Sequence, residues 1–133
     1  MTRYLLDTNA VISLLNDAES PLASRARQHH PSEIAISAIV LHELFYGAFK
    51  SQRTAHNVTL VDALRLEALE FDREDARRAG ELRARLTLIG RPIGPYDVLI
   101  AGQALARQLI LVTHNTGEFG RIEDLTVEDW EAP

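Results

Sequence analysis

The sequence predicts an α/β fold, in which helices cover both faces of a short, mostly parallel central sheet as a three-layer α/β/α sandwich. Short apolar runs alternate along the chain with segments of helical periodicity, a pattern typical of β-α-β units. Two of the runs, 5–6 and 110–112, show no polar alternation, as expected of central strands buried on both sides. A chain of 133 residues suits one core, so we expect a single domain over residues 1–133.

The first half of the chain is predicted to contribute two strands and four helices. Ser20 followed by Pro21 is a strong helix start, and Ser37 is expected to cap a further helix. Thr8 or Asn9 is the expected cap of the first helix. Strands are expected at 3–6 and 34–36, and helices at 10–16, 21–29, 38–50 and 53–66.

The second half is predicted to supply the remaining strands and two long helices. Asp72 and Asp75 have the spacing of a capping box, and Pro95 favours a new helix after the rigid connector 91–95. Strands are expected at 69–71, 109–113 and 126–127, and helices at 73–90 and 96–107.

Composition excludes several classes of function. The chain has no cysteine, which rules out disulfides, thiolate zinc sites and a cysteine nucleophile. The net charge is −5 and the pI about 5.5, so the chain as a whole does not have the charge of a nucleic-acid binder, although a local basic rim stays compatible with it. The amino terminus is not typical of a signal peptide and no run is long enough to span a bilayer, so we expect a cytoplasmic protein.

Three carboxylates interrupt the most apolar segments of the chain. Asp7 ends the run 4–6, Glu43 stands within 38–45, and Asp97 precedes the run 98–101. A buried charge is normally paired or coordinates a metal, and the three acids together favour a shared divalent cation. Each residue also has a plain structural interpretation: a turn or cap for Asp7, a half-exposed helix position for Glu43 and a first-turn acid for Asp97.

The expected topology brings part of this set together. Asp7 and the turn 113–115 each follow a predicted strand, and the carboxyl ends of adjacent parallel strands form ligand sites in open α/β sheets. Carboxylate oxygens select Mg²⁺ or Mn²⁺ rather than zinc. Of the five histidines only His114 falls in a turn of the expected site, and the chain has no glycine-rich nucleotide loop.

Four segments contain the acids and the turn described above: Leu5-Leu6-Asp7-Thr8-Asn9, Leu41-His42-Glu43-Leu44-Phe45-Tyr46-Gly47, Gly94-Pro95-Tyr96-Asp97-Val98-Leu99-Ile100-Ala101 and Leu111-Val112-Thr113-His114-Asn115-Thr116-Gly117-Glu118-Phe119. In this order they resemble the motifs of PIN-domain ribonucleases, and the chain is most similar to the VapC toxins of bacterial toxin–antitoxin pairs. The resemblance implies a PIN-like fold and a Mg²⁺- or Mn²⁺-dependent endoribonuclease that acts on structured RNA, with tRNA as the expected target.

The resemblance also implies roles for particular residues. Asp7, Glu43 and Asp97 correspond to the metal-binding acids, and Asn115 takes a fourth catalytic position where many PIN domains have Asp. Water activated by the cation would cleave the phosphodiester bond, with Glu43 assisting its deprotonation. Expected supporting residues are Thr8, Thr113 and Glu118, and an expected phosphate rim consists of Lys50, Arg53 and Arg91.

The resemblance implies a cognate VapB-like antitoxin and a homodimer, and no membrane. Two other interpretations remain open at this point. One is a binding module that keeps the PIN fold but has lost catalysis, for which the neutral Asn115 is the warning sign. The other is a phosphatase with Asp7 as nucleophile, although such enzymes usually have a second acid at the position that Asn9 takes here.

Overall fold

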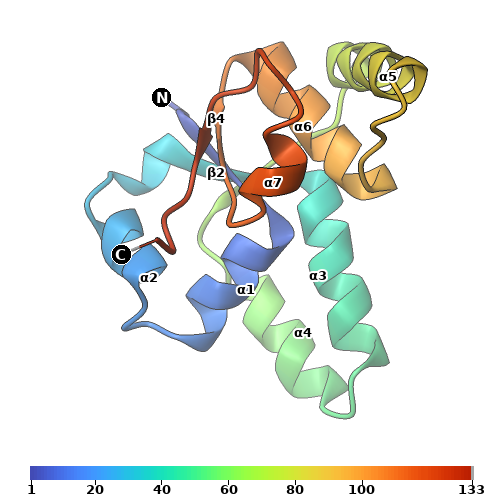
Figure 1. Cartoon of the computed structure of the whole chain (residues 1–133). Coiled ribbons are helices and arrows are strands. Elements are labelled where there is room, and N and C mark those ends of the chain that lie inside the picture. Colours follow the sequence, from blue (N-terminus) through green and yellow to red (C-terminus); the bar gives the residue numbers. More distant parts are fainter. Residues whose placement is uncertain (133) are drawn as a thin grey trace.

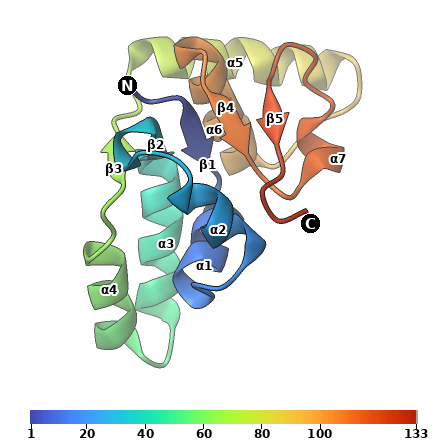
Figure 2. The same cartoon turned by 90° about the vertical axis from the view of Figure 1, so that its left-hand side faces the viewer.

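The computed structural model describes residues 1–132 and shows a five-stranded sheet with the order β3-β2-β1-β4-β5 (Figures 1 and 2). Every neighbouring pair of strands is parallel. The α/β prediction is therefore confirmed, and the sheet is entirely rather than mostly parallel. The strands are β1 (Tyr4–Leu6), β2 (Ile34–Ser37), β3 (Glu67–Leu69), β4 (Ile110–Val112) and β5 (Val127–Glu128).

Helices fill the connections between the strands. They are α1 (Thr8–Asn16), α2 (Pro21–Arg27), α3 (Ala38–Lys50), α4 (Thr54–Asp62), α5 (Arg73–Leu88), α6 (Pro95–Arg107) and α7 (Thr116–Phe119), with a 3₁₀ turn η1 (Pro31–Glu33). The first two crossovers move toward β3 and the third returns across the sheet, so right-handed connections place α1 to α4 on one face and α5 and α6 on the other. The pairs α3–α4 and α5–α6 pack side by side (Figure 1).

The core lies on both sides of the central strands. All three residues of β1 are buried, as are Leu111 and Val112 of β4. Trp130, beyond the last strand, is also fully buried and packs edge-on against Tyr4. The sheet and helices thereby form a rigid base whose strand ends carry the polar residues discussed below.

Local sequence signals place most helix starts correctly. The Ser20 and Ser37 hydroxyls accept hydrogen bonds from the backbone amides of Ala23 and Ile39, and Asp72 and Asp75 form the expected capping box. The expected cap of α1 is wrong, because Asp7 rather than Thr8 or Asn9 fills that position. The helix begins directly after β1, so the acid that ends the strand is also the residue that caps the helix.

Several expected boundaries are also wrong, since strand pairing overrides local preference. The strand expected at 69–71 lies two residues earlier, because Glu67 pairs with Ala35 of β2. The helix expected at 53–66 ends at Asp62, since the chain must extend before it joins β3. The short helix α7 was not expected at all. Within residues 1–132, no helix has the length and apolar character needed to cross a membrane.

Candidate active site

The candidate site lies where β1 and β4 end. Leu6 and Val112 are paired in the parallel ladder, and the backbone amide of Asp7 donates to the carbonyl of Val112 (3.1 Å). The expected proximity of Asp7 to the turn 113–115 is confirmed. In Figure 2 the arrowheads of β1 and β4 point to this edge, from which α1 leaves. This is the usual ligand-binding edge of an open α/β sheet.

Asp7 is held firmly and is nearly inaccessible. Asp7 is only 5% exposed. Its Oδ1 accepts a hydrogen bond from the backbone amide of Ala10 (2.8 Å), and its Oδ2 accepts one from the hydroxyl of Thr113 (2.5 Å). Burial raises the pKa of Asp7 above its usual value, and the negative charges of Glu131 and Glu43 raise it further, whereas the two hydrogen bonds oppose the rise. Asp7 is thus a desolvated carboxylate without a basic partner among these groups.

Glu43 reaches the same region from α3. Its Oε1 accepts a hydrogen bond from the hydroxyl of Thr8 (2.8 Å), which joins the first turn of α1 to the middle of α3. The side chain is half-buried and lines a cleft together with Thr8. Thr8 therefore has the supporting position expected of it, since its hydroxyl fixes the direction of one carboxylate oxygen.

Asp97 lies in the first turn of α6 and completes the set. Burial, and then the negative charges of Glu118, Asp7 and Glu43, raise the pKa of Asp97 to about 6. Asp97 therefore lies near three other carboxylates, those of Asp7, Glu43 and Glu118. The structure brings Asp7, Glu43 and Asp97 to one place, as the sequence led us to expect.

Asn115 and Glu118 lie at the site and are hydrogen-bonded to each other; Asn115 lines a hollow together with Asp7. The side chain of Asn115 caps α7, and its Nδ2 donates to Oε2 of Glu118 (3.0 Å). Oε1 of Glu118 accepts from the amide of Gly94 (2.7 Å). These hydrogen bonds from Gly94 and Asn115 lower the pKa of Glu118. Glu118 is therefore the ionised acid at this corner, and Asn115 positions it.

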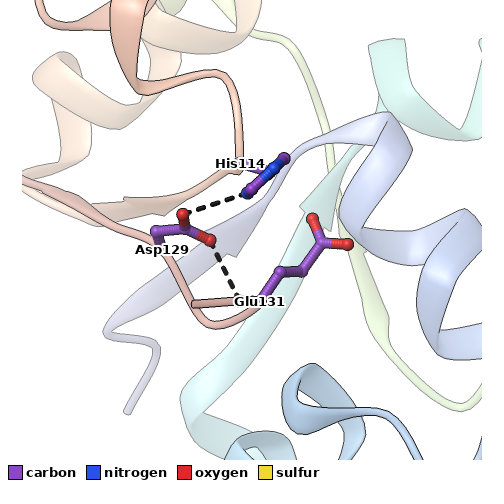
Figure 3. A group of neighbouring side chains, drawn as sticks. All are labelled: His114, Asp129 and Glu131. Carbon is purple, nitrogen blue, oxygen red and sulfur yellow. Dashed lines mark hydrogen bonds and ion pairs between the residues drawn. The ribbon is translucent and has the colours of Figure 1, made fainter. Parts of the chain in front are cut away.

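His114, the one histidine expected in a turn of the site, forms a further cluster there with Asp129 and Glu131, two acids that sequence reasoning missed. Figure 3 shows His114 Nδ1 hydrogen-bonded to Asp129 Oδ2 (3.0 Å), and the Glu131 amide also donates to Asp129. Glu131 lines a hollow of about 380 Å³ together with Asp7 and His114. The sequence signal was the pair of acids on either side of Trp130, whose burial fixes where both lie.

The two groups of acids differ in compactness. Among residues 1–132, His114, Asp129 and Glu131 are the set of potential ligands whose donor atoms all lie within 4.8 Å of one another. The carboxylates of Asp7, Glu43 and Asp97 form a looser set, with Asp7 bound to Thr113 and Glu43 to Thr8.

The expected basic residues are placed unequally. Lys50, at the end of α3, lines the same cleft as Glu43. Arg53 is exposed at the start of α4, and Arg91 is exposed in the loop before α6. Only Lys50 thus shares a cleft with a site acid in the part of the chain that the structure describes.

The donor set fits a hard divalent cation. It consists of carboxylate oxygens, and the charged groups that shift the pKa values of Asp7 and Asp97 are all acidic. Such a site favours Mg²⁺ or Mn²⁺ over zinc. Asp7, Asp97 and Glu43 are the residues that would hold the ion.

Comparisons with known proteins agree with this geometry. Residues 4–125 match the PIN domain family. The chain is 39% identical to the tRNA(fMet)-specific endonuclease VapC of Shigella flexneri and 40% identical to the VapC of the same name from Salmonella typhimurium; each alignment covers 98% of this chain and 99% of the relative. The VapC chain in the crystal structure of DNA-bound VapBC from Salmonella typhimurium superposes with a TM-score of 0.92 at 40% identity, covering 98% of this chain and 99% of that one.

A parallel sheet with carboxylates gathered at its carboxyl edge, together with the family match, defines a PIN-domain nuclease. The chain belongs to the PIN-domain family, and within it to the VapC ribonucleases of toxin–antitoxin pairs.

Proposed function

We propose that this chain is a divalent-cation-dependent endoribonuclease that cleaves tRNA as the toxin of a toxin–antitoxin pair. The observation that carries the proposal is the convergence of Asp7, Glu43 and Asp97 from three separate elements, with the pKa of Asp97 raised to about 6 by burial and by the other acids. An array of like charges in a partly buried position is unfavourable for stability alone, which favours a functional role.

Asp7, Asp97 and Glu43 would hold Mg²⁺ or Mn²⁺. When bound, the ion lowers the pKa of a water molecule and neutralises charge on the scissile phosphate. Thr113 and the amide of Ala10 keep Asp7 in one orientation, and Thr8 does the same for Glu43. The free oxygen of Glu43 is left to accept a proton from the attacking water.

The substrate assignment to tRNA rests on similarity. The relatives from Shigella flexneri and Salmonella typhimurium are named as tRNA(fMet)-specific endonucleases, and the alignments span nearly the whole of each chain. We infer the same class of RNA for this chain, which would meet it in the cytoplasm. An acidic centre needs nearby cations to bind a polyanion, and Lys50 is placed to serve this purpose.

An antitoxin partner is supported by an apolar groove beside the site. Solved VapBC complexes superpose closely on this chain. The groove has a volume of about 240 Å³, and the apolar side chains that line it include Ile12, Leu15 and Leu60, all exposed in the isolated chain. An antitoxin segment lying there would cover these side chains and reach Glu43, which lines the groove as well.

A homodimer would cover a second apolar patch. Leu88, at the end of α5, is 86% exposed, and Ile89 beside it is also exposed. Neighbouring large apolar side chains that are exposed to solvent are typical of an interface. The patch belongs to the opposite face of the sheet from the groove, so both partners could bind at once.

The test is metal-dependent cleavage of a tRNA(fMet) transcript by nuclease-free protein. We expect cutting at one position in Mg²⁺ or Mn²⁺ and none in EDTA. Asp97→Asn keeps the size of the side chain and should abolish cutting while circular dichroism and the melting temperature stay native. Asp124→Asn, an exposed acid that pairs with Arg78, is the matched control and should cut normally. Cleavage by Asp97→Asn at the wild-type rate would refute the assignment.

A further inference from the structure

A cleft of about 620 Å³ lies between α1, α3 and the start of α6. Its lining includes Thr8 and Glu43, the hydrogen-bonded pair of the candidate active site. It also includes the rings of His42, Tyr46 and Tyr96. The cleft is therefore continuous with the catalytic acids but has a different chemical character, since aromatic rings take the place of carboxylates.

The rings of this cleft are exposed although their size would suit the core. Tyr46 is 60% exposed and Tyr96 is 47% exposed. The rings of His42 from α3 and Tyr96 from α6 pack against each other with their centroids 5.8 Å apart and their planes tilted by 56°, and both line the cleft. Exposed aromatic faces are the surfaces on which proteins stack unpaired nucleobases, and they accept any base.

The ammonium group of Lys50 lies next to these rings, at the end of α3. His42, Tyr46 and Lys50 follow one another at intervals of four residues, which places them on one stripe of α3. The ammonium of Lys50 lies 4.8 Å from the centroid of the Tyr46 ring. Lys50 is the only lysine of the chain, and it lies about 10 Å along the helix axis from Glu43. An anion bound by Lys50 would therefore lie beyond the rings, away from the acids.

Gly47 keeps the floor of the cleft open. A Cβ atom added there would have no atom within 4 Å, and the residue lies in α3 where other residue types are more favourable. Any larger side chain at this position would project between Glu43 and Tyr46 into the space that the cleft encloses.

We propose that this cleft binds the unstacked base of an RNA nucleotide next to the scissile phosphate, stacked on Tyr96 and Tyr46, while Lys50 contacts the phosphate on the far side of that base. The inference rests on the proposed function and names a binding site within it. Tyr96 directly precedes Asp97 and Tyr46 is one helical turn from Glu43, so a base held here leaves its phosphate at the acids.

The mixed lining of the cleft, in which polar and charged groups stand beside aromatic and apolar ones, favours RNA over an antitoxin peptide as its occupant. Its walls combine tyrosine hydroxyls, an imidazole, the amide of Asn9 and the ammonium of Lys50. The neighbouring apolar groove shares Ile12 with the cleft and adds Leu15 and Leu60, and so already offers the surface that an amphipathic peptide needs. A base and a phosphate use both the rings and the ammonium, whereas an apolar side chain would leave Lys50 without a partner.

The experiment measures binding of a fluorescein-labelled RNA hairpin with the anticodon loop of tRNA(fMet), in EDTA, by anisotropy. Each base of the loop is replaced in turn by an abasic residue. We expect one abasic position to weaken binding by about tenfold, the size of one lost stacking contact. Tyr96→Leu should weaken binding of the intact hairpin by a similar factor. The abasic replacement at that position should then have no further effect on binding by Tyr96→Leu. Tyr96→Phe keeps the ring and should behave as wild type.

Gly47→Leu should block the cleft and weaken binding at least as much. Gly80→Leu is its matched control, because Gly80 is also a helical glycine with open space around it but lies on α5. Phe49→Leu, which removes an exposed ring of α3 outside the cleft, should also bind normally.

The inference would be overturned if no abasic position weakened binding of the hairpin, or if Tyr96→Leu bound the intact hairpin as tightly as wild type. Loss of affinity by Tyr96→Leu for the antitoxin but not for RNA would also overturn it, in favour of a peptide site. Cleavage of the same hairpin by the wild-type chain in Mg²⁺ is scored separately. If the wild-type chain cleaves the hairpin but no abasic position weakens binding, only the base-binding role of the cleft is refuted. If the hairpin is not cleaved, the result counts against the proposed function itself.

Discussion

The hydroxyl of Thr113 donates a hydrogen bond of 2.5 Å to Oδ2 of Asp7, although 106 residues separate the two in the chain. The bond joins the carboxyl ends of β4 and β1. The same hydroxyl accepts from the amide of Asn115 (3.0 Å), so one small side chain orients an acid of the site and the turn that leads to Glu118.

Thr113→Val should weaken metal binding without removing any proposed ligand. Valine has nearly the same shape but no hydroxyl, so Asp7 loses the hydrogen bond that favours its ionised form. Loss of such an orienting partner typically costs 10- to 100-fold in metal affinity. We expect a loss of about that size for Mn²⁺ in isothermal titration calorimetry. Thr126→Val, at an exposed threonine, should titrate as wild type, and equal affinities for the two variants would contradict the role.

The stability of the metal-free protein should fall as the pH rises from about 4 to about 6. The pKa of Asp97 is about 6 in the folded chain and 3.8 as its ordinary value, so between these values the folded state binds more protons than the unfolded state. Stability then decreases with pH across this window and levels off above it. Melting temperatures measured in EDTA at pH 4 to 8 would show the decline, and Asp97→Asn should make it shallower, with the raised pKa of Asp7 accounting for what is left. A curve for Asp97→Asn as steep as that of wild type would contradict this assignment.

Two glycines should respond in opposite directions to alanine. Gly47→Ala adds a methyl group in open space within α3 and should stabilise the protein by roughly 0.5–1 kcal/mol. Gly102→Ala should destabilise it by roughly 1–3 kcal/mol, because the added Cβ would lie 2.5 Å from the Cα and Cβ atoms of Ala79. Urea unfolding of both variants measures the difference. Equal stabilities would show that α5 moves away from α6 without cost.

Arg107→Leu should destabilise the α5–α6 pair. The guanidinium donates to both oxygens of Asp75, a carboxylate that is only 1% exposed, and these contacts lower the pKa of Asp75 against the opposing effect of its burial. Removing one partner of a buried ion pair typically lowers the free energy of unfolding by about 3–5 kcal/mol. Because Arg107 is partly exposed, we expect a smaller loss of roughly 2–3 kcal/mol.

Arg85→Leu is the matched control for this prediction, since Arg85 pairs with Asp124 on the surface, and its loss should cost less than about 1 kcal/mol. Urea denaturation gives both values. A cost for Arg107→Leu no greater than that of Arg85→Leu would show that Asp75 stays solvated or finds another donor.

Local features of the sequence were sufficient for most of the fold. Ser20, Ser37 and the Asp72–Asp75 pair cap helices through contacts three residues or fewer away, which can be predicted without knowing the tertiary structure. β3 was misplaced because its position depends on pairing with β2, and Glu67 and Ala68 are not apolar enough to mark a strand. Register across a sheet is a long-range property that a local pattern does not encode.

The site was predictable where an acid interrupts an apolar segment, as with Asp7, Glu43 and Asp97. The roles of these residues and of the expected basic rim stay predictions until the variants are measured. Glu131 and Asp129 escaped notice because surface acids near the end of a chain are common, and only the burial of Trp130 brings them to the strand ends. Asn115 was expected at the reaction centre, but its cap of α7 and its contact with Glu118 depend on a helix that the sequence did not reveal.

The anchoring of Trp130 has a practical consequence for how the protein is purified. The Trp130 ring packs against Tyr4 and His29, and Glu131 directly after it lines a hollow together with Asp7. A nickel-binding oligohistidine segment inserted after Glu131 would therefore bring nickel to that hollow. Met1 is 99% exposed, so a tag joined to Met1 would extend into solvent.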